Sequence, residues 1–232
     1  VARAKELGQR AVAITDHGVM FGVIDFYKEA KAQGIKPIVG CEVYVAPRRM
    51  TDRQYEYDSE PYHMVLLCKD ETGYKNLIKL VSLGFTEGFY VKPRIDLELL
   101  AKHTEGLICL SACLAGAVPR MLLSGDYECA ADYAKKLKSM FGDDFYLELQ
   151  DHGIDEQKKL NPELIKLSKD LDIPLAATND VHYINRADSY IQDVLMCFQM
   201  NRTVDDPDRM RFASDEFYLK SGDEMAELFK GY

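Results

Sequence analysis

Two stretches far apart in the chain place a carboxylate and an imidazole directly after a short apolar run. They read Ala13-Ile14-Thr15-Asp16-His17 and Ala176-Ala177-Thr178-Asn179-Asp180-Val181-His182. Such runs are typical of buried parallel strands, and in strand–helix folds the loop after each strand carries the chemistry. Because Asp and His together suit zinc, manganese or iron, the two stretches predict a metal site built from strand ends. The alternative is that Asp16 or Asp180 caps a following helix and each His is merely packed nearby.

Three further side chains could contribute ligands. Glu42 lies inside the apolar run 38–45, where burying a carboxylate is costly unless a metal or a basic partner meets it. His63 opens a run and Cys113 follows one, and a thiolate at such a junction is a soft ligand. Taken alone, His63 is more often a hydrogen-bonded core residue and Cys113 a small buried hydrophobe. His63 also begins its run, which is not where simple barrel logic places a ligand.

The basic residues suggest only local contacts with a nucleic acid. Lys92 and Arg94 flank Pro93 after Phe89 and Tyr90, and a mixture of aromatic and basic side chains could hold a strand end. The alternative for this segment is a solvated loop. A second basic cluster lies in a polar stretch that we expect to form a mobile loop over the site or on its rim, and it consists of Arg48, Arg49 and Arg53.

Composition and charge indicate which classes of protein this chain could belong to. A chain of 232 residues with 47% hydrophobic content can bury one large core. Its net charge of -9 argues against a free-standing module that grips the phosphate backbone by bulk electrostatics. No apolar run reaches the roughly 18 residues of a membrane helix and no signal peptide opens the chain, so we expect a cytoplasmic protein with no membrane partner. The six Cys residues are expected to be reduced thiols.

Apolar runs of strand length alternate with helical periodicity, which predicts an α/β fold with parallel strands. The expected strands are 11–14, 38–45, 64–68, 107–110, 145–149 and 175–177. The expected helices are 23–33, 72–85, 118–123, 127–141, 155–171, 191–200 and 222–229, with a further one begun by residues 1–7. Residues 204–208 form a turn-rich break. We therefore predict a barrel domain over 1–203 and a C-terminal extension over 204–232.

An ordered set of motifs connects these candidates to a known family. The set is Thr15-Asp16-His17, Gly40-Cys41-Glu42, Tyr62-His63, Ser111-Ala112-Cys113 and Asn179-Asp180-Val181-His182. It resembles the polymerase and histidinol phosphatase (PHP) domain, in the version at the N-terminus of bacterial DNA polymerase III alpha subunits. The resemblance implies a distorted seven-stranded β/α barrel that binds up to three divalent metals (Zn, Mn or Fe) at one end and hydrolyses phosphoesters there.

Transferred residue by residue, the resemblance implies a role for each candidate. Glu42, His63 and Cys113 would hold one metal, His17 and His182 a second, and Asp180 a third beside Glu42. The catalytic group implied is Glu42, Asp180 and His182. Lys92 and Arg94 are the candidate substrate contacts. Asp16 would lie behind the ligands, orienting an imidazole or capping a helix.

The family's first motif, His-x-His on an initial strand, is absent from this chain. We expect that strand and about three of its ligands to lie outside the sequence. Only the metal of Glu42, His63 and Cys113 needs nothing from that strand, so about one tightly bound metal and weak phosphoesterase activity are predicted.

Three functions remain open at this point. The first is a PHP domain of a replicative polymerase with 3′ to 5′ exonuclease activity, acting on DNA through the parent polymerase. The second is a metal-stabilised scaffold that docks other polymerase III subunits, including a proofreading subunit. The third is a free-standing phosphatase for a small phosphate ester, which the polymerase-like connecting sequence disfavours.

Overall fold

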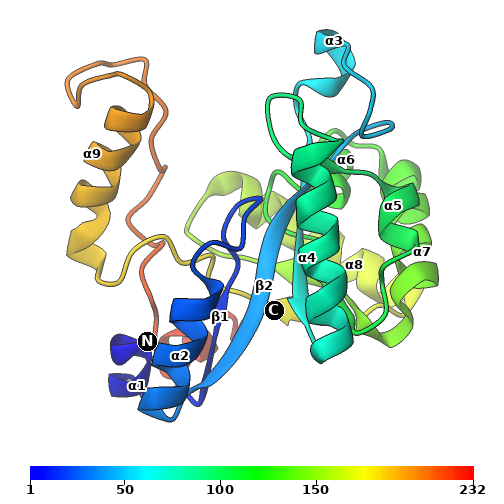
Figure 1. Ribbon diagram of the computed structural model, residues 1–232. Helices are drawn as coiled ribbons and strands as arrows, with labels where there is room; N and C mark the ends of the chain where they lie inside the picture. The colour runs from blue at the N-terminus through cyan, green and yellow to red at the C-terminus, as the bar shows by residue number, and fades with distance from the viewer.

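The computed structural model describes residues 1–232, which form one curled sheet with helices on its outer face (Figure 1). The sheet has seven strands, six of them in the order β1-β2-β3-β5-β6-β7, while β4 pairs with β2. Their bounds are β1 Ala11–Ile14, β2 Lys36–Val45, β3 Tyr62–Cys68, β4 Arg94–Ile95, β5 Leu107–Leu110, β6 Phe145–Leu149 and β7 Leu175–Ala177. The expected α/β class of PHP type is confirmed, with the sheet curled into a half-barrel. β1 and β7 form its two edges, so the barrel is open between them.

The direction of β3 corrects the prediction of a parallel sheet. β1 and β2 are parallel, as are β5, β6 and β7, but β3 is antiparallel to both β2 and β5. The long segment 46–61 turns the chain back at the end where β2 finishes, so β3 starts there. The first residues of β3 therefore share one end of the sheet with the last residues of its neighbours.

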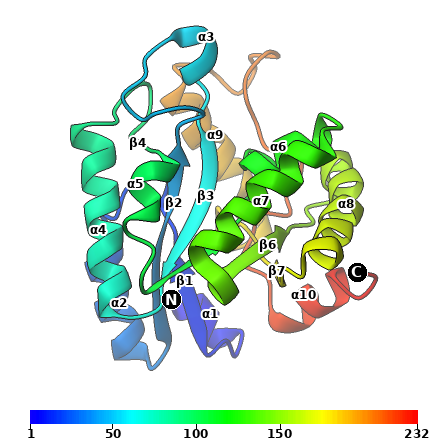
Figure 2. The same ribbon diagram turned by 90° about the vertical axis from the view of Figure 1, so that its right-hand side faces the viewer.

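Helices surround the sheet on its convex side. Figure 2 shows α4 and α5 on one flank and α6, α7 and α8 on the other. The longer helices are α2 Val23–Gln33, α4 Glu71–Thr86, α7 Tyr127–Phe141, α8 Asp155–Leu171 and α9 Ser189–Gln199. The shorter ones are α1 Ala2–Glu6, α3 Tyr55–Asp58, α5 Leu97–Ala101, α6 Ala117–Leu123 and α10 Gly222–Leu228. The sequence predicted neither α3, α5 nor β4, because elements of two to five residues are too short to show a period.

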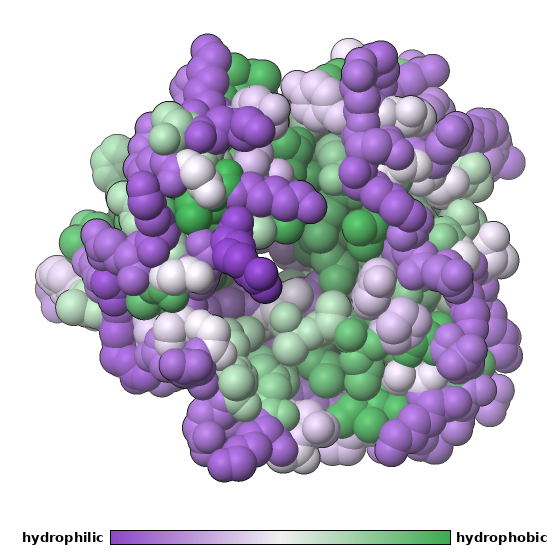
Figure 3. Space-filling model, turned by 90° about the horizontal axis from the view of Figure 1, so that it is seen from below, coloured by the Kyte–Doolittle hydropathy of each residue, from purple (hydrophilic) through white to green (hydrophobic).

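The side chains of each strand alternate between two environments. In β3, Leu66 packs into the main core beneath the helices, whereas Val65 and its partner Leu110 belong to a separate small cluster on the concave face. The same period of two sends Leu147 and Leu149 of β6 into the main core. The space-filling view in Figure 3 shows a hollow near the centre of the molecule, with largely apolar walls and a hydrophilic surround. The concave face is therefore free to present side chains to a cavity.

None of the helices combines the length and the apolar character that crossing a bilayer requires.

Candidate metal centre

Strand register places Glu42 and His63 on the concave face at one end of the sheet. Cys41 and Val43 point into the main core, so Glu42 between them points the other way. Tyr44 pairs with His63 across the two strands, and both lie on the same face as Glu42. Because β3 is antiparallel, His63 at its beginning reaches the same end of the sheet as Glu42. This resolves the apparent conflict between the position of His63 and the logic of a barrel.

His17 reaches the same point from the loop after β1. The backbone of this loop is tied to β2: Gly18 N donates to Glu42 O at 2.9 Å, and Glu42 N donates to Asp16 O at 3.1 Å. His17 Nδ1 then lies 3.2 Å from Glu42 Oε1, and His63 Nδ1 lies 2.5 Å from the same oxygen. One carboxylate oxygen is thus shared by two imidazole nitrogens that come from different strands.

This group has the donor set of a metal site. The ligand atoms of His17, Glu42 and His63 all lie within 4.8 Å of one another. Glu42 Oε1 is buried and accepts no hydrogen bond of regular geometry, although the Nδ1 atoms of His17 and His63 lie close to it. Burial raises the pKa of the Glu42 carboxyl, but its contacts with His17 and His63 outweigh burial and lower the pKa to about 2. A buried, ionised oxygen facing two imidazole nitrogens fits a divalent cation.

The predicted ligands Cys113 and His182 lie beside this group. Cys113 Sγ is 3.7 Å from His63 Nδ1, and burial raises the pKa of its thiol. The ring of His182 lies 6.0 Å from that of His17, centroid to centroid. Asp180 shares a cavity of about 480 Å³ with His17, Glu42 and His182. The structure therefore brings all six predicted ligands to one end of the sheet, although more than 130 residues separate Glu42 from Asp180.

The helix-capping alternative is wrong for both aspartates. α2 begins after Gly22 without a side-chain cap, and Asn185 and Asp188 precede the helices that follow Asp180. Asp180 instead adopts a left-handed backbone conformation, with φ +46°, at the end of β7. Asp16 lines the cavity and holds β2 through its carbonyl, which also accepts a hydrogen bond from Cys41 Sγ at 3.2 Å. The predicted contact of its carboxylate with an imidazole is not among the hydrogen bonds.

Sequence reasoning missed Glu148 as a residue of this cavity. It lies between Leu147 and Leu149 in β6 and faces the concave side with Glu42. A carboxylate inside an apolar strand was the signal that identified Glu42, and the same signal was present here. Burial, together with the charges of Asp180 and Glu42, raises the pKa of the Glu148 carboxyl to about 7, although the hydrogen bonds from Thr178 and Gln150 act to lower it.

The two predicted substrate contacts have different positions. Lys92 is exposed and its Nζ lies 5.5 Å from the centre of the Tyr44 ring, which stacks beside His17. Arg94 is wrong as a substrate contact because it is fully buried. Its guanidinium donates to four backbone carbonyls at 2.8–3.1 Å, those of Met50, Asp52, Asp58 and Gly88.

The same contacts tie the segment 46–61, which the sequence suggested is a mobile loop, to the rest of the fold. Arg94 holds the segment 46–61 from beneath through three of its carbonyls. Arg48 donates to the buried carboxylate of Asp58, with its Nε at 3.0 Å, and is therefore not free to bind a ligand. In Figure 1 this segment, with α3 at its tip, projects beyond the end of β2.

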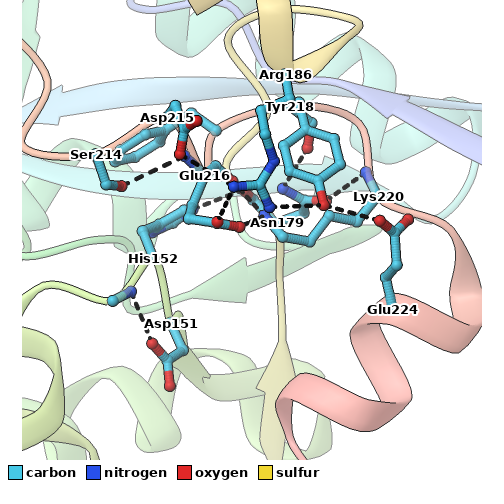
Figure 4. Close-up of polar contacts among 12 residues, drawn as sticks. Asp151, His152, Asn179, Arg186, Ser214, Asp215, Glu216, Tyr218, Lys220 and Glu224 are labelled. Carbon is cyan, nitrogen blue, oxygen red and sulfur yellow. Dashed lines mark hydrogen bonds and ion pairs between the residues drawn. The ribbon is translucent and has the colours of Figure 1, made fainter.

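The C-terminal segment holds the loop after β7 in place (Figure 4). Asn179 Nδ2 donates to Tyr218 O and its Oδ1 accepts from Lys220 N, both at 2.9 Å. His182 N donates to Phe217 O at 2.9 Å, and the Phe217 ring stacks on His152. Residues 217–220 therefore support the loop that carries the predicted ligands Asp180 and His182. The division of the chain at residue 203 into a barrel domain and an extension stays a prediction.

Comparison with known proteins agrees with this geometry. The PHP domain family matches residues 1–152 of the chain. Among curated proteins, the chain is similar to the DNA polymerase III subunit alpha of Treponema pallidum (strain Nichols), with 52% identity over 100% of this chain and 20% of that protein. The subunit from Borreliella burgdorferi is 47% identical over 99% of this chain and 20% of its own length. That from Thermus aquaticus is 45% identical over 94% and 18%. The chain spans about a fifth of the length of these relatives. On the match over residues 1–152 and the motifs around the cavity, the chain belongs to the PHP domain family.

Proposed function

We propose that this chain is the PHP domain of a bacterial DNA polymerase III alpha subunit and that it cleaves phosphoester bonds at a DNA 3′ end with divalent metal. The observation that carries the proposal is Glu42 Oε1, a buried oxygen without a hydrogen-bond partner between the imidazoles of His17 and His63. The relatives at 45–52% identity support the polymerase context. Such a domain would act in the cytoplasm, on DNA and beside the other subunits of the replicase.

The residues divide into those that hold a cation and those that support them. His17, Glu42 and His63 would hold it, with Cys113 adjacent to His63 and with Asp180 and His182 across the cavity. A bound divalent cation supplies a Lewis acid that neutralises phosphate charge and makes water a better nucleophile near neutral pH. His17 must be neutral to serve as a ligand, but contact with Glu42 raises its pKa. Metal therefore competes with a proton at this imidazole.

Lys92 is the remaining candidate for substrate binding. Its ammonium group lies over the Tyr44 ring, and that ring lies 6.4 Å from the ring of His17 and 5.2 Å from the ring of His63. This places one positive charge at the edge of the cation-binding group. Since the chain carries a net charge of -9, a local contact of this kind is the means by which it would attract a phosphate.

The test is the release of nucleotides from the 3′ end of single-stranded DNA by the intact natural protein with manganese or zinc. We expect Glu42→Gln to lower the rate at least ~100-fold, because losing a metal ligand removes several kcal/mol of stabilisation from the transition state. Lys102→Ala, at an exposed site just after α5 and away from the cavity, should leave the rate unchanged. Equal cleavage by the wild type and Glu42→Gln would overturn the proposal, and metal binding without cleavage would also overturn it and favour the scaffold function.

A further inference from the structure

A second cavity, of about 300 Å³, lies beside the metal centre and is lined by residues of α9 and of the segment 209–215. We call it the α9 cavity. In Figure 1, α9 and the segment that returns from it stand away from the sheet, and an ion pair between Asp193 and Arg209 joins them. Phe212 lines the α9 cavity, and its ring lies 4.7 Å, centroid to centroid, from the ring of His182, which lines the metal cavity. The Phe212 ring therefore connects the two cavities.

Arg211 is the cation of the α9 cavity that no acidic group engages. Two carboxylates line this cavity, those of Asp193 and Asp215. Arg209 binds both oxygens of Asp193, with Nη2 2.7 Å from Oδ2, and Arg186 Nη1 lies 3.1 Å from Asp215 Oδ1 (Figure 4). The Arg211 side chain is exposed and forms neither an ion pair nor a hydrogen bond. Because a guanidinium presents donors that match a phosphate, the α9 cavity offers a position for an anion on an acidic chain.

Aromatic rings form another part of the wall of the α9 cavity. Tyr183 is buried, Phe212 is half-buried, and Tyr190 at the start of α9 is 65% exposed. Partly exposed rings beside an arginine are typical of sites for single-stranded nucleic acid, where bases stack on the rings and the cation meets the phosphate. The volume lies at the lower end of the ~300–1,000 Å³ of small-ligand sites, which is room for about one nucleotide.

We propose that the α9 cavity binds one nucleotide of a single DNA strand, next to the nucleotide whose phosphoester bond lies at the metal centre. Arg211 contacts the phosphate of this nucleotide, and the rings of Tyr190 and Phe212 contact its base. The inference rests on the proposed function, because it names the site that holds the strand while the terminal bond is cleaved. A small phosphate ester has no second nucleotide, so the α9 cavity favours a DNA strand over such an ester.

The test is the binding of a short oligothymidylate, labelled with fluorescein at its 5′ end, to this chain, followed by fluorescence anisotropy in chelator. The chelator removes metal, so the titration measures contacts outside the metal centre and does not depend on cleavage. Arg211→Met removes the charge and keeps the length of the side chain. We expect it to weaken binding at least ~tenfold, because hydrogen bonds to a charged partner are lost. Tyr190→Leu should weaken binding about fivefold or more through lost stacking.

Arg202→Met is the matched control for the charge. Arg202 is exposed just after α9, its side chain has no partner, and it does not line the α9 cavity. This variant loses the same charge, and at physiological salt, where exposed charges more than ~8 Å apart are largely screened, it should bind the oligonucleotide as the wild type does. Both arginine variants should melt at the wild-type temperature, since neither side chain has a contact to lose.

Several outcomes would overturn the inference. Equal weakening by Arg211→Met and Arg202→Met would mean that overall charge, and not the α9 cavity, attracts the strand. Equal affinity for an abasic oligonucleotide would show that no base is bound. Competition by an acidic peptide as effective as by unlabelled oligothymidylate would identify a protein segment as the occupant instead, and a wild type that binds no oligonucleotide would leave the cavity without this ligand. The proposed function fails by a different result, cleavage by the intact protein that does not depend on Glu42.

Discussion

His63 Nδ1 lies 2.5 Å from Glu42 Oε1 across two strands that run in opposite directions. The antiparallel course of β3 is what makes this contact: it brings the first residues of one strand to the level where the other strand is nearing its end. A parallel β3 would place His63 at the far end of the sheet. The metal centre therefore depends on a reversal of one strand inside an otherwise parallel arrangement.

His63→Ala and Cys113→Ser should lower the metal content of the purified protein, because each removes a ligand next to Glu42. We expect the larger loss for His63→Ala, whose nitrogen is nearer to Glu42 Oε1. Elemental analysis after purification without chelator measures the stoichiometry. His103→Ala is the matched control, since His103 contacts the Leu99 carbonyl on α5 and does not line the cavity. Equal metal in all four proteins would place the metal elsewhere.

Arg94 and Lys92 should differ in what they support. Arg94→Met leaves four backbone carbonyls without their donor, so we expect the free energy of unfolding to fall by about 3 kcal/mol or more. Lys92→Met removes an exposed side chain and should change stability by less than ~0.5 kcal/mol, while weakening the binding of single-stranded DNA. Urea unfolding and DNA titration measure the two effects. A stable Arg94→Met variant with impaired DNA binding would restore the original assignment of Arg94.

Stability without metal should fall as the pH rises from about 4.5 to about 7. The pKa of Glu148 is raised from 4.5 to about 7, so over this interval the folded protein keeps a proton that the unfolded chain releases. The contribution is complete below pH 4.5 and is lost as the pH passes 7. At ~1.4 kcal/mol per pKa unit, the loss is of the order of 2 kcal/mol or more. Unfolding of wild type and Glu148→Gln in chelator at pH 5 and pH 8 measures it.

The wild type and Glu148→Gln should differ in how their stability changes between pH 5 and pH 8. Glu148→Gln carries no titrating group at this position, so it should be more stable than the wild type at pH 8 and similar to it at pH 5. Identical pH slopes in the two proteins would show that Glu148 does not hold a proton in the folded state.

Asn179→Asp should loosen the C-terminal segment. Its new carboxylate oxygen would face the Tyr218 carbonyl in place of an N–H donor, which costs about 1 to 3 kcal/mol for a bond of this kind. We expect faster hydrogen exchange at the amides of Phe217 and Lys220, with helix α7 unchanged as an internal reference. Uniform acceleration across the whole chain would indicate general destabilisation instead.

The sequence predicted much of this fold because local pattern and burial agree. The bounds of β1, β5, β6 and β7 follow from their apolar runs, and α2, α7 and α8 match the predicted ranges. The direction of β3 could not be predicted, since an apolar run has the same appearance in a parallel and an antiparallel strand.

Among the side chains at the site, some could be recognised from the local sequence pattern and others could not. Glu42 was recognisable as a carboxylate inside an apolar strand, and Glu148 carried the same signal, but its Leu-Glu-Leu pattern equally describes a strand with one solvated face. The burial of Arg94 had no local signal. It arises from the distant segment 46–61, whose carbonyls face the guanidinium only after the chain has folded.

The most direct test of the metal centre is anomalous diffraction at the zinc edge from crystals of the protein grown with zinc. The account predicts a peak within coordination distance, about 2.0–2.2 Å, of Glu42 Oε1 and of a ring nitrogen of His63. A map with no peak between His17, Glu42 and His63, while zinc is bound elsewhere on the same molecule, would contradict it.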